Sequence, residues 1–441
     1  MSIFKYFILL TTLLTLSSCM PEKEVKLDPN LDYVDFIPHG ADSIEIDSAI
    51  SEHVINIPNA KKNNSWHSSS FSLNNIPHNL YAKINLQNPK IKTYKLTPGS
   101  ESSSRDNIVV ANDTIYTSSR GTVFAYHLSN PSKLRWKKTV EKEKDNLVGG
   151  GIYYKDKHIA ITTGGKDLVI LNSYTGKEVW RYRLSNISRS TPVIYQNRVY
   201  VVTIDNALYA INLKTGFVEW GIKEAHENLG FLGGSSPESY DKSIIMPFSS
   251  GKILSINAET GKEIWSASLS ATSGDESYIN DIDMVPVIKD GILYISSHNG
   301  ILYAINAAKG TLEWANRYAG GHSQLWVAND YLYTINKNNQ LLAIYKVTGS
   351  VKWAVGLEAI KKSKKAAILF SDNSTTFNGP TMINGNLYIT SSNGHLLVFN
   401  AVSGKKLKDI KIKKGNNSPV ITAGEHIYFL SGNGTLTVIG Q

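Results

Sequence analysis

Short candidate strands separated by tight turns recur along the chain from about residue 98 onwards. The pattern is clearest between residues 190 and 222, where candidate strands cover 190–194, 198–202, 208–212 and 217–220. The turns between them are built on Asn, Asp and Gly. Asn and Asp bond back to their own backbone, and Gly supplies the positive φ that a bulged hairpin needs. This segment therefore predicts four short antiparallel strands in a meander.

Tryptophan marks the same point of six repeats, and five of the six tryptophans follow a glycine by four residues. Repeats of about 40–45 residues with four strands each are typical of a β-propeller. Strands such as 199–202 are apolar on both faces, as expected for sheets buried between neighbouring blades. We therefore expect the tryptophans to pack between blades as structural residues. They are Trp136, Trp180, Trp220, Trp265, Trp314 and Trp353.

Counting the repeats gives eight units, and the eighth is incomplete. Its segments 418–421, 426–429 and 435–438 supply only three strands. An outer strand has to come from elsewhere, because an open sheet edge promotes aggregation.

Residues 80–96 mimic the end of a unit, with Tyr94 in the tryptophan position. We therefore predict an all-β fold, an eight-bladed β-propeller of four-stranded antiparallel blades. The propeller is expected over residues 78–441, with residues 78–97 closing it as the outer strand of blade eight.

Composition places the chain among ordinary globular proteins. It has 441 residues, of which 41% are hydrophobic and 19% charged, and this excludes wholesale disorder and a polytopic membrane protein. The formal net charge of +9 is spread along the chain, whereas nucleic-acid binding requires basic residues gathered on one face. We therefore expect no nucleic-acid partner.

The N-terminus predicts a lipid anchor. A short apolar run over residues 6–16 has the length of a signal-peptide core, and Leu-Ser-Ser-Cys follows it with the chain's one cysteine, Cys19. This sequence resembles a bacterial lipobox, which implies a signal peptide over residues 1–18 and acylation, including palmitate, at Cys19. The alternative is an ordinary secretory signal with an incidental cysteine. Met20 follows in place of an inner-membrane-retaining Asp, which favours the outer membrane.

Residues 19–77 are expected to be a lipidated N-terminus and polar tether, because they show no sustained strand or helix period. Trp66 is a lone aromatic residue in this stretch. We expect it to dock on the folded body and not to bind a ligand.

Catalytic chemistry finds little support in the sequence. The eleven histidines show no metal-binding spacing, and no nucleophile elbow or phosphate-binding loop is present. Asp281 and Asp283 alone are weak evidence for a calcium site. The prediction is a protein that is not an enzyme, with no catalytic residue, no metal and no cofactor.

The segment 210–220 resembles the tryptophan-docking motif of propellers related to quinoprotein (PQQ) dehydrogenases. It recurs at 255–265, 304–314 and 343–353, and more loosely at 170–180. Together with the lipobox and eight blades, the chain resembles the BamB family, lipoproteins of the outer-membrane β-barrel assembly machinery. That resemblance implies a non-enzymatic scaffold, lipid-anchored in the outer membrane and facing the periplasm. Its partner would be a BamA-like barrel assembly protein, with unfolded outer-membrane proteins as possible substrates and a monomer within the complex.

Two loops match the partner-binding pattern of that family. Leu229 and Phe231 fit apolar positions, while Leu232 stands where the family has an arginine, and Asp281 and Asp283 match an acidic pair. Both loops join the outer strand of one blade to the inner strand of the next, at junctions 3/4 and 4/5. In a meander such connections emerge on one face, so the loops would form an apolar patch with an acidic neighbour. The alternative is that the apolar residues tuck under blade four and the aspartates cap turns.

Two other functions stay open at this point. One is a PQQ-dependent dehydrogenase or PQQ-binding protein, in which Trp326, outside the repeat register, would floor a central ligand site. The chain's single cysteine excludes the vicinal disulfide that often accompanies PQQ. The other is binding of anionic polymer or lipid through the lysine runs at 361–365 and 405–414, which more often form a solvated rim.

Overall fold

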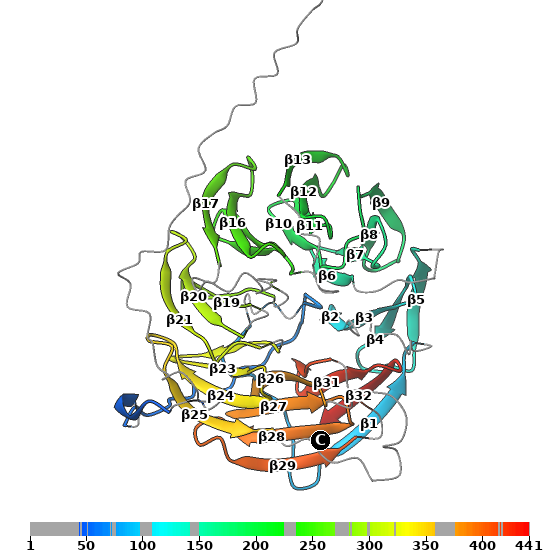
Figure 1. The fold of residues 1–441 in the computed structure, drawn as a ribbon. Helices are drawn as coiled ribbons and strands as arrows, with labels where there is room; N and C mark the ends of the chain where they lie inside the picture. Colours follow the sequence, from blue (N-terminus) through cyan, green and yellow to red (C-terminus); the bar gives the residue numbers. More distant parts are fainter. Residues whose placement is uncertain are drawn as a thin grey trace, which may run out of the picture.

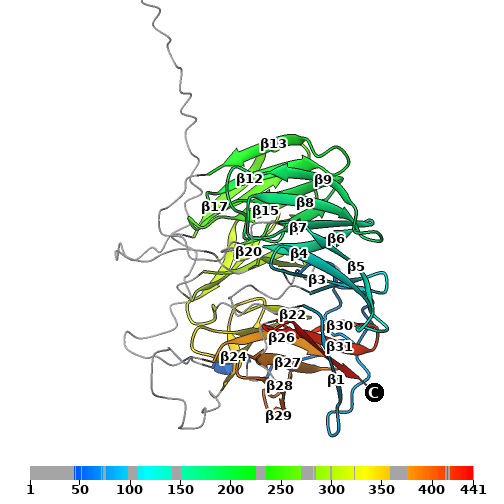
Figure 2. The same cartoon turned by 90° about the vertical axis from the view of Figure 1, so that its right-hand side faces the viewer.

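The computed structural model describes residues 44, 46–50, 52–70, 72, 76–97, 108–141, 150–224, 235–269, 282, 285–297, 300–321, 323–357, 375–412, 415 and 418–440. Within these residues the chain forms 32 strands and one short 3₁₀ helix, η1 (Ser48–Ile50). The strands form eight four-stranded antiparallel sheets arranged in a ring (Figure 1; Figure 2). The prediction of an eight-bladed β-propeller is confirmed.

The first four blades follow the chain as simple meanders, and their strands are listed in order. Blade one has β2 (Ile108–Ala111), β3 (Thr114–Ser119), β4 (Thr122–His127) and β5 (Leu134–Thr139). Blade two has β6 (Gly151–Lys155), β7 (His158–Thr162), β8 (Asp167–Asn172) and β9 (Glu178–Arg183). Blade three has β10 (Val193–Tyr195), β11 (Arg198–Val202), β12 (Ala207–Asn212) and β13 (Val218–Lys223). Blade four has β14 (Glu238–Tyr240), β15 (Ser243–Pro247), β16 (Lys252–Asn257) and β17 (Glu263–Ser268).

Blades five to seven repeat the same order. Blade five has β18 (Val287–Lys289), β19 (Ile292–Ser296), β20 (Leu302–Asn306) and β21 (Leu312–Asn316). Blade six has β22 (Trp326–Ala328), β23 (Tyr331–Ile335), β24 (Gln340–Tyr345) and β25 (Val351–Gly356). Blade seven has β26 (Phe377–Ile383), β27 (Asn386–Ser391), β28 (His395–Asn400) and β29 (Lys406–Lys411). Blade eight combines β30 (Ile421–Ala423), β31 (His426–Ser431) and β32 (Thr435–Gly440) with β1 (Lys90–Lys95).

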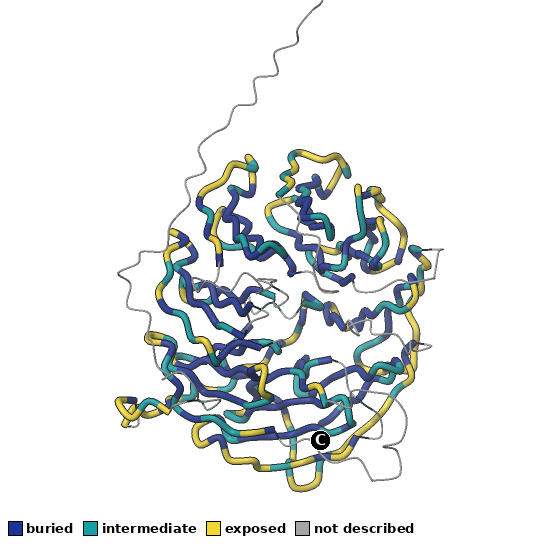
Figure 3. The backbone as a smooth tube through the Cα atoms, viewed as in Figure 1, coloured by how far each residue is buried: buried dark blue, intermediate teal, exposed yellow. Residues whose placement is uncertain are grey.

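The meander gives the ring two different faces. Turns between strands one and two and between strands three and four lie on one face, which we call the arm face. Turns between strands two and three, together with the connections from blade to blade, lie on the opposite face, which we call the loop face. The second and third strands of each blade are mostly buried, while the outer strands are largely exposed (Figure 3).

Closure of the ring comes from the N-terminal side of the chain, as predicted. Strand β1 pairs antiparallel with β32, with Tyr94 opposite Leu436. The position expected for Tyr94 was wrong by two residues. In blade three, Trp220 is opposite Ala210, and the residue of blade eight that corresponds to Ala210 is Val438. Lys92 is opposite Val438, so Lys92 occupies the tryptophan position. The β12–β13 pair has a bulge beyond this point, whereas β1 and β32 pair without one, so counting residues along the chain misplaced the slot.

The repeated tryptophans join neighbouring blades. The indole N–H of Trp136 donates to the carbonyl of Ser173 in the next blade at 2.9 Å, and the indole N–H of Trp180 donates to that of Leu213 at 2.7 Å. The same bond forms from Trp220, Trp265 and Trp314. Among the described residues the Trp353 indole N–H has no hydrogen-bond acceptor, although its side chain is also buried. These contacts confirm the structural role expected of the tryptophans.

The glycine before each docking tryptophan also serves the tryptophan of the preceding blade. Gly261 adopts φ +71°, and a Cβ placed there would lie 2.8 Å from the ring of Trp220. Only glycine therefore combines this left-handed conformation with so close an approach of an indole ring. The repeated Gly-x-x-x-Trp spacing thus encodes both sides of a blade junction.

Residues 52–70, expected to be part of the tether, are instead packed against the propeller. With residues 76–83 they form a segment that we call the arm, seen in Figure 1 as the blue trace running from the side of blade six across the middle of the ring. Trp66 is 1% exposed and exchanges backbone hydrogen bonds with Val110 of β2, at 2.7 and 2.8 Å. The expectation that Trp66 docks on the folded body is confirmed.

The arm touches successive blades. Beyond Trp66 its backbone bonds to blade two, where the Ser69 N–H donates to the Ile152 carbonyl at 3.0 Å. On the way it bonds to blade eight through Asn63 and Gly424, and on its return it bonds to blade seven through Leu80 and Met382. Successive parts of the arm pair with different blades, so the arm has no uniform strand period. Its apolar side chains join the largest core cluster, as Ile55, Trp66, Ile76, Leu80 and Ala82.

Candidate docking face

The loops predicted to bind a partner lie at neighbouring blade junctions. Residues 224–237 connect β13 to β14, and residues 269–286 connect β17 to β18. The strand ends from which both connections start lie on the loop face. The predicted contact residues Leu229, Phe231, Leu232, Asp281 and Asp283 lie outside the described residues. So do the lipidation candidate Cys19, residues 361–365 and the last two lysines of the run at 405–414. The residues at the ends of the two loops are described, and they show how the loops are attached to the blades.

A buried apolar residue follows the outer strand in most blades. Leu184 and Leu269 are examples: each is 2% exposed, and each donates its backbone N–H to a carbonyl of the turn between strands two and three. Blade three breaks this pattern, because Glu224 occupies the position and makes the same backbone bond to Asn206. The connection carrying Leu229 and Phe231 therefore starts from a carboxylate and not from an apolar anchor.

Ion pairs stabilise this starting point. The Glu224 carboxylate receives a hydrogen bond from Lys252 of blade four at 3.1 Å, which links two blades beneath the connection. Beside it, Lys223 lies 3.2 Å from the Asp205 carboxylate, which also accepts a hydrogen bond from the Thr203 hydroxyl at 2.6 Å. Burial alone would raise the pKa of Asp205, but the bonds from Thr203 and Lys223 together hold that pKa below its usual value.

The far end of the first connection is also fixed. Ser235 and Ser236, which precede β14, are 4% and 2% exposed. The Ser236 hydroxyl accepts a hydrogen bond from the backbone N–H of Thr191, at the entry to blade three, over 3.0 Å. Both ends of the connection between β13 and β14 are thus attached to the frame of blades three and four.

The second connection is attached through one residue between the two predicted aspartates. Ile282 is 1% exposed and belongs to a core cluster built by blades four and five, which also contains Leu269 and Ile288. Asp281 and Asp283 are its covalent neighbours. The two aspartates therefore flank, in the chain, a residue that is held in the core of blades four and five. This junction is next to the one that carries Leu229 and Phe231.

Other described features bear on enzymatic alternatives. Trp326, proposed as the floor of a central ligand site, is 1% exposed, and its indole N–H donates to the His78 carbonyl of the arm at 2.7 Å. In the described part of the chain, no three His, Cys, Asp or Glu side chains gather closely enough to hold a metal ion. Among the described residues, no helix has the length and apolar character needed to cross a bilayer.

The arm is a structural element whose course over the ring was not predicted from the sequence. His78 accepts a hydrogen bond from the Asn329 N–H at its Nδ1 atom, over 3.1 Å, and this requires the unprotonated imidazole nitrogen. Burial, reinforced by the nearby Lys289 ammonium, lowers the pKa of His78. Lys289 in turn donates to the Ile76 carbonyl at 3.2 Å. The only sequence signal for this docking was Trp66, an isolated aromatic residue in polar surroundings.

A family model, a relative in sequence and a solved structure all point to one protein family. A family model described as "Outer membrane protein assembly factor BamB" matches residues 132–355, just over half of the chain. The outer membrane protein assembly factor BamB of Yersinia pestis is 24% identical over 293 residues, covering 66% of this chain and 71% of its own. The crystal structure of BamB from Moraxella catarrhalis superposes with a TM-score of 0.66 at 18% identity, covering 80% of this chain and all of that one.

A europium-containing methanol dehydrogenase also has a similar fold. Its TM-score is 0.66 at 13% identity, and the match covers 86% of this chain and 98% of the enzyme chain. At that identity the likeness concerns the propeller alone. It does not transfer an activity.

Proposed function

Because the chain belongs to the family of the outer membrane protein assembly factor BamB, we propose that it serves the assembly of outer-membrane proteins as a non-enzymatic scaffold. In this function the propeller is a rigid ring that presents inter-blade connections on its loop face. Its partner is a BamA-like barrel assembly protein, and Cys19 carries the lipid anchor that holds the ring at the periplasmic side of the outer membrane. Binding of unfolded outer-membrane proteins is a further part of this proposal.

The observation that carries the proposal is the adjacency of two anchored connections. One is fixed by the Glu224–Lys252 ion pair and by Ser236, the other by Ile282. An apolar connection beside an acidic one fits a hot spot with a charged rim, in which the apolar residues supply affinity and the charges supply specificity. The contact residues are Leu229, Phe231, Leu232, Asp281 and Asp283.

The experiment is capture of the purified periplasmic domains of the BamA-like protein from the same organism. Charge reversal of Asp281 and Asp283 to lysine, combined with Phe231→Ala, is expected to weaken capture at least about tenfold, as loss of one hot-spot contact would. The thermal midpoint should stay at the parent value. A matched control reverses Glu259 and Glu263, exposed residues of blade four away from the loop face, and should leave capture unchanged.

Two results would reject the docking site. Capture that survives the triple variant places the contact elsewhere, and equal weakening by the control means that only net charge matters. For the quinoprotein alternative, the test is addition of PQQ with calcium. The arm covers Trp326, so this residue is not open to a ligand in the centre of the ring. The scaffold proposal therefore expects that PQQ leaves the tryptophan fluorescence unquenched.

A further inference from the structure

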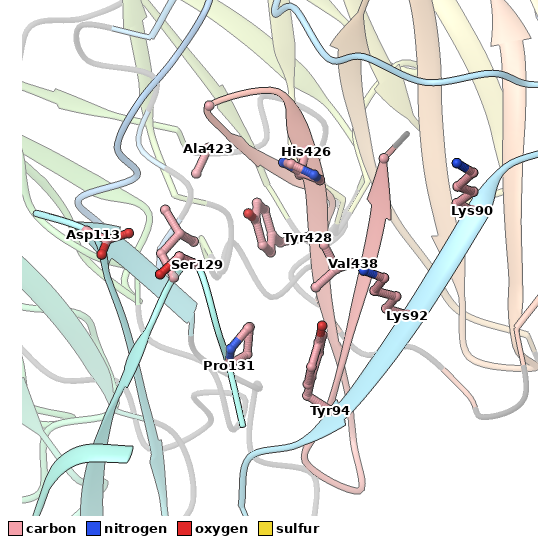
Figure 4. A pocket seen from close by; sticks show the side chains of 13 residues that line it. Lys90, Lys92, Tyr94, Asp113, Ser129, Pro131, Ala423, His426, Tyr428 and Val438 are labelled. Carbon is pink, nitrogen blue, oxygen red and sulfur yellow. The ribbon is translucent and has the colours of Figure 1, made fainter. Parts of the chain in front are cut away.

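A pocket of about 410 Å³ lies at the seam between blade eight and blade one. It opens on the arm face, opposite to the loop face. Figure 4 shows Tyr94, Tyr428 and Val438 of blade eight across the pocket from Ser129 and Pro131 of blade one. Lys90 and Lys92 of β1 line the same pocket.

The other junctions show what usually fills this place. In blade three, the Tyr200 hydroxyl and the Trp220 indole N–H both donate to the carbonyl of Ala258 in the next blade, at 2.8 and 3.2 Å. The two rings lie 5.7 Å apart. The arrangement recurs in blade one, where Tyr116 and Trp136 share one carbonyl of blade two. In these two junctions a tyrosine and an indole of one blade therefore share one carbonyl of the next blade.

At the seam the same frame is present except for the indole. Tyr428 is opposite Val438 in the strand register, as Tyr200 is opposite Ala210 in blade three. On the other side of that register position stands Lys92, where blade three has Trp220. The pocket therefore retains the junction tyrosine and lacks the tryptophan.

The acceptor side is retained as well. The Leu128 N–H donates to the Asp113 carbonyl at 3.0 Å, just as the Ala258 N–H donates to the Lys242 carbonyl at 2.9 Å. Leu128 thus corresponds to Ala258, whose carbonyl receives the indole. In place of the docking glycine of other turns, blade one has the segment Asn130-Pro131-Ser132. Blade eight thus lacks the tryptophan, and blade one lacks the glycine turn that would receive it. The space that an indole fills at other junctions is part of the pocket here.

The charges at the rim are unequal. Lys90 and Lys92 are exposed, and within the described part of the chain neither enters an ion pair. The carboxylate opposite, Asp113, is paired with Arg135 at 3.3 Å, so its charge is compensated. An occupant with a negative charge next to an aromatic ring is therefore favoured.

We propose that the seam pocket receives an aromatic side chain, tryptophan above all, from a partner polypeptide that carries an acidic residue beside it. The internal repeat argues for an amino-acid side chain, because an indole fills the same frame elsewhere in this ring. Strand β1 is also the outermost strand of its sheet, and among the described residues no strand pairs with its other edge, where an extended segment can add by strand pairing. The site is separate from the loop face and does not rest on the docking proposed there.

The test uses short fluorescein-labelled peptides and the full chain without its signal peptide. A peptide containing Trp-Asp between Gly and Ser residues should bind saturably, with a dissociation constant of about 1 mM or tighter. Replacing its Trp by Ala, or its Asp by Lys, should weaken binding at least about tenfold. The variant Lys92→Trp supplies the missing indole from within and should abolish binding.

Matched variants separate filling of the pocket from general effects. Thr93→Trp places an indole on the same strand at an exposed position outside the pocket, and it should bind like the parent. The double change Lys90→Glu and Lys92→Glu keeps the pocket open and should weaken binding of the Trp-Asp peptide. The proposal fails if the parent does not distinguish the Trp from the Ala peptide. It also fails if Lys92→Trp, folded by its thermal midpoint, binds as the parent does.

Discussion

Trp66 and Val110 form an isolated antiparallel bridge, in which each backbone N–H donates to the other residue's carbonyl. Through this bridge the arm pairs with the innermost strand of blade one, and the indole of Trp66 enters the main core cluster. A segment that composition assigns to a polar tether is thereby an integral part of the folded ring.

Replacement of Trp66 by alanine should lower the free energy of unfolding by about 3–5 kcal/mol, because a fully buried indole leaves a cavity. Chemical denaturation measures the loss. Limited proteolysis should at the same time cut the arm in the variant faster than in the parent. Asn64→Ala, an exposed neighbour, is the control and should change neither. Unchanged stability of Trp66→Ala would mean that the arm is not part of the cooperative fold.

A pair of glycines tests the encoding of the junctions. Gly261→Ala should destabilise strongly, because it combines a left-handed φ with a Cβ only 2.8 Å from the Trp220 ring. Gly424→Ala imposes a similar φ of +64° but meets no atom within 4 Å. We expect Gly424→Ala to cost about 1 kcal/mol and Gly261→Ala about 1–3 kcal/mol more. Equal unfolding midpoints for the two variants would contradict the steric role assigned to glycine.

The stability contributed by the arm should depend on pH through His78. Burial lowers the pKa of this imidazole in the folded state, so the unfolded chain binds protons more readily. The stabilisation is complete above the ordinary histidine pKa of about 6.5 and is lost as pH falls through the lowered folded value.

Unfolding midpoints measured between about pH 7.5 and about pH 5.5 should therefore fall, in a range above most carboxylate titrations. His78→Gln removes the titrating group and should flatten part of this profile. A profile of the same slope in both proteins would show that His78 does not contribute.

Anchoring is tested at one residue. Cys19→Ser should move the protein from the membrane fraction to the soluble periplasmic fraction and abolish incorporation of radiolabelled palmitate. Ser18→Ala leaves the cysteine in place and serves as the control. Incorporation of palmitate into Cys19→Ser would show that the lipid is attached elsewhere.

The fold could be predicted from the sequence because the repeat depends on glycine and tryptophan residues that few other residues can replace. Gly216 and Trp220 sit at fixed spacing since one packs against the preceding blade's indole and the other enters the following blade. The closing strand has no such glycine turn before it. Spacing along the chain therefore points to Tyr94, and only the strand register identifies Lys92 as the residue at the tryptophan position.

For the candidate site, the sequence predicts which blade junctions carry the loops but not the contacts that attach them. The order of strands predicts that the connections at junctions 3/4 and 4/5 leave the blades on one face, whatever their sequence. Glu224 looks like any surface carboxylate in the sequence, and its pairing with Lys252 of the next blade needs the fold to be seen. The arm escaped prediction because its backbone partners change from blade to blade, so burial left no periodic pattern.

The pairing of Tyr94 with Leu436 joins strands about 340 residues apart in the chain. Bringing such distant segments together has an entropic free-energy cost of about 5 kcal/mol plus a constant, and interactions elsewhere in the ring have to offset this cost before the seam can form. The ring therefore closes only after β32 has been synthesised, and until then β1 has no strand to pair with. Folding of this protein should accordingly be slow and cooperative, with the unpaired β1 segment as the part most exposed to proteases and chaperones.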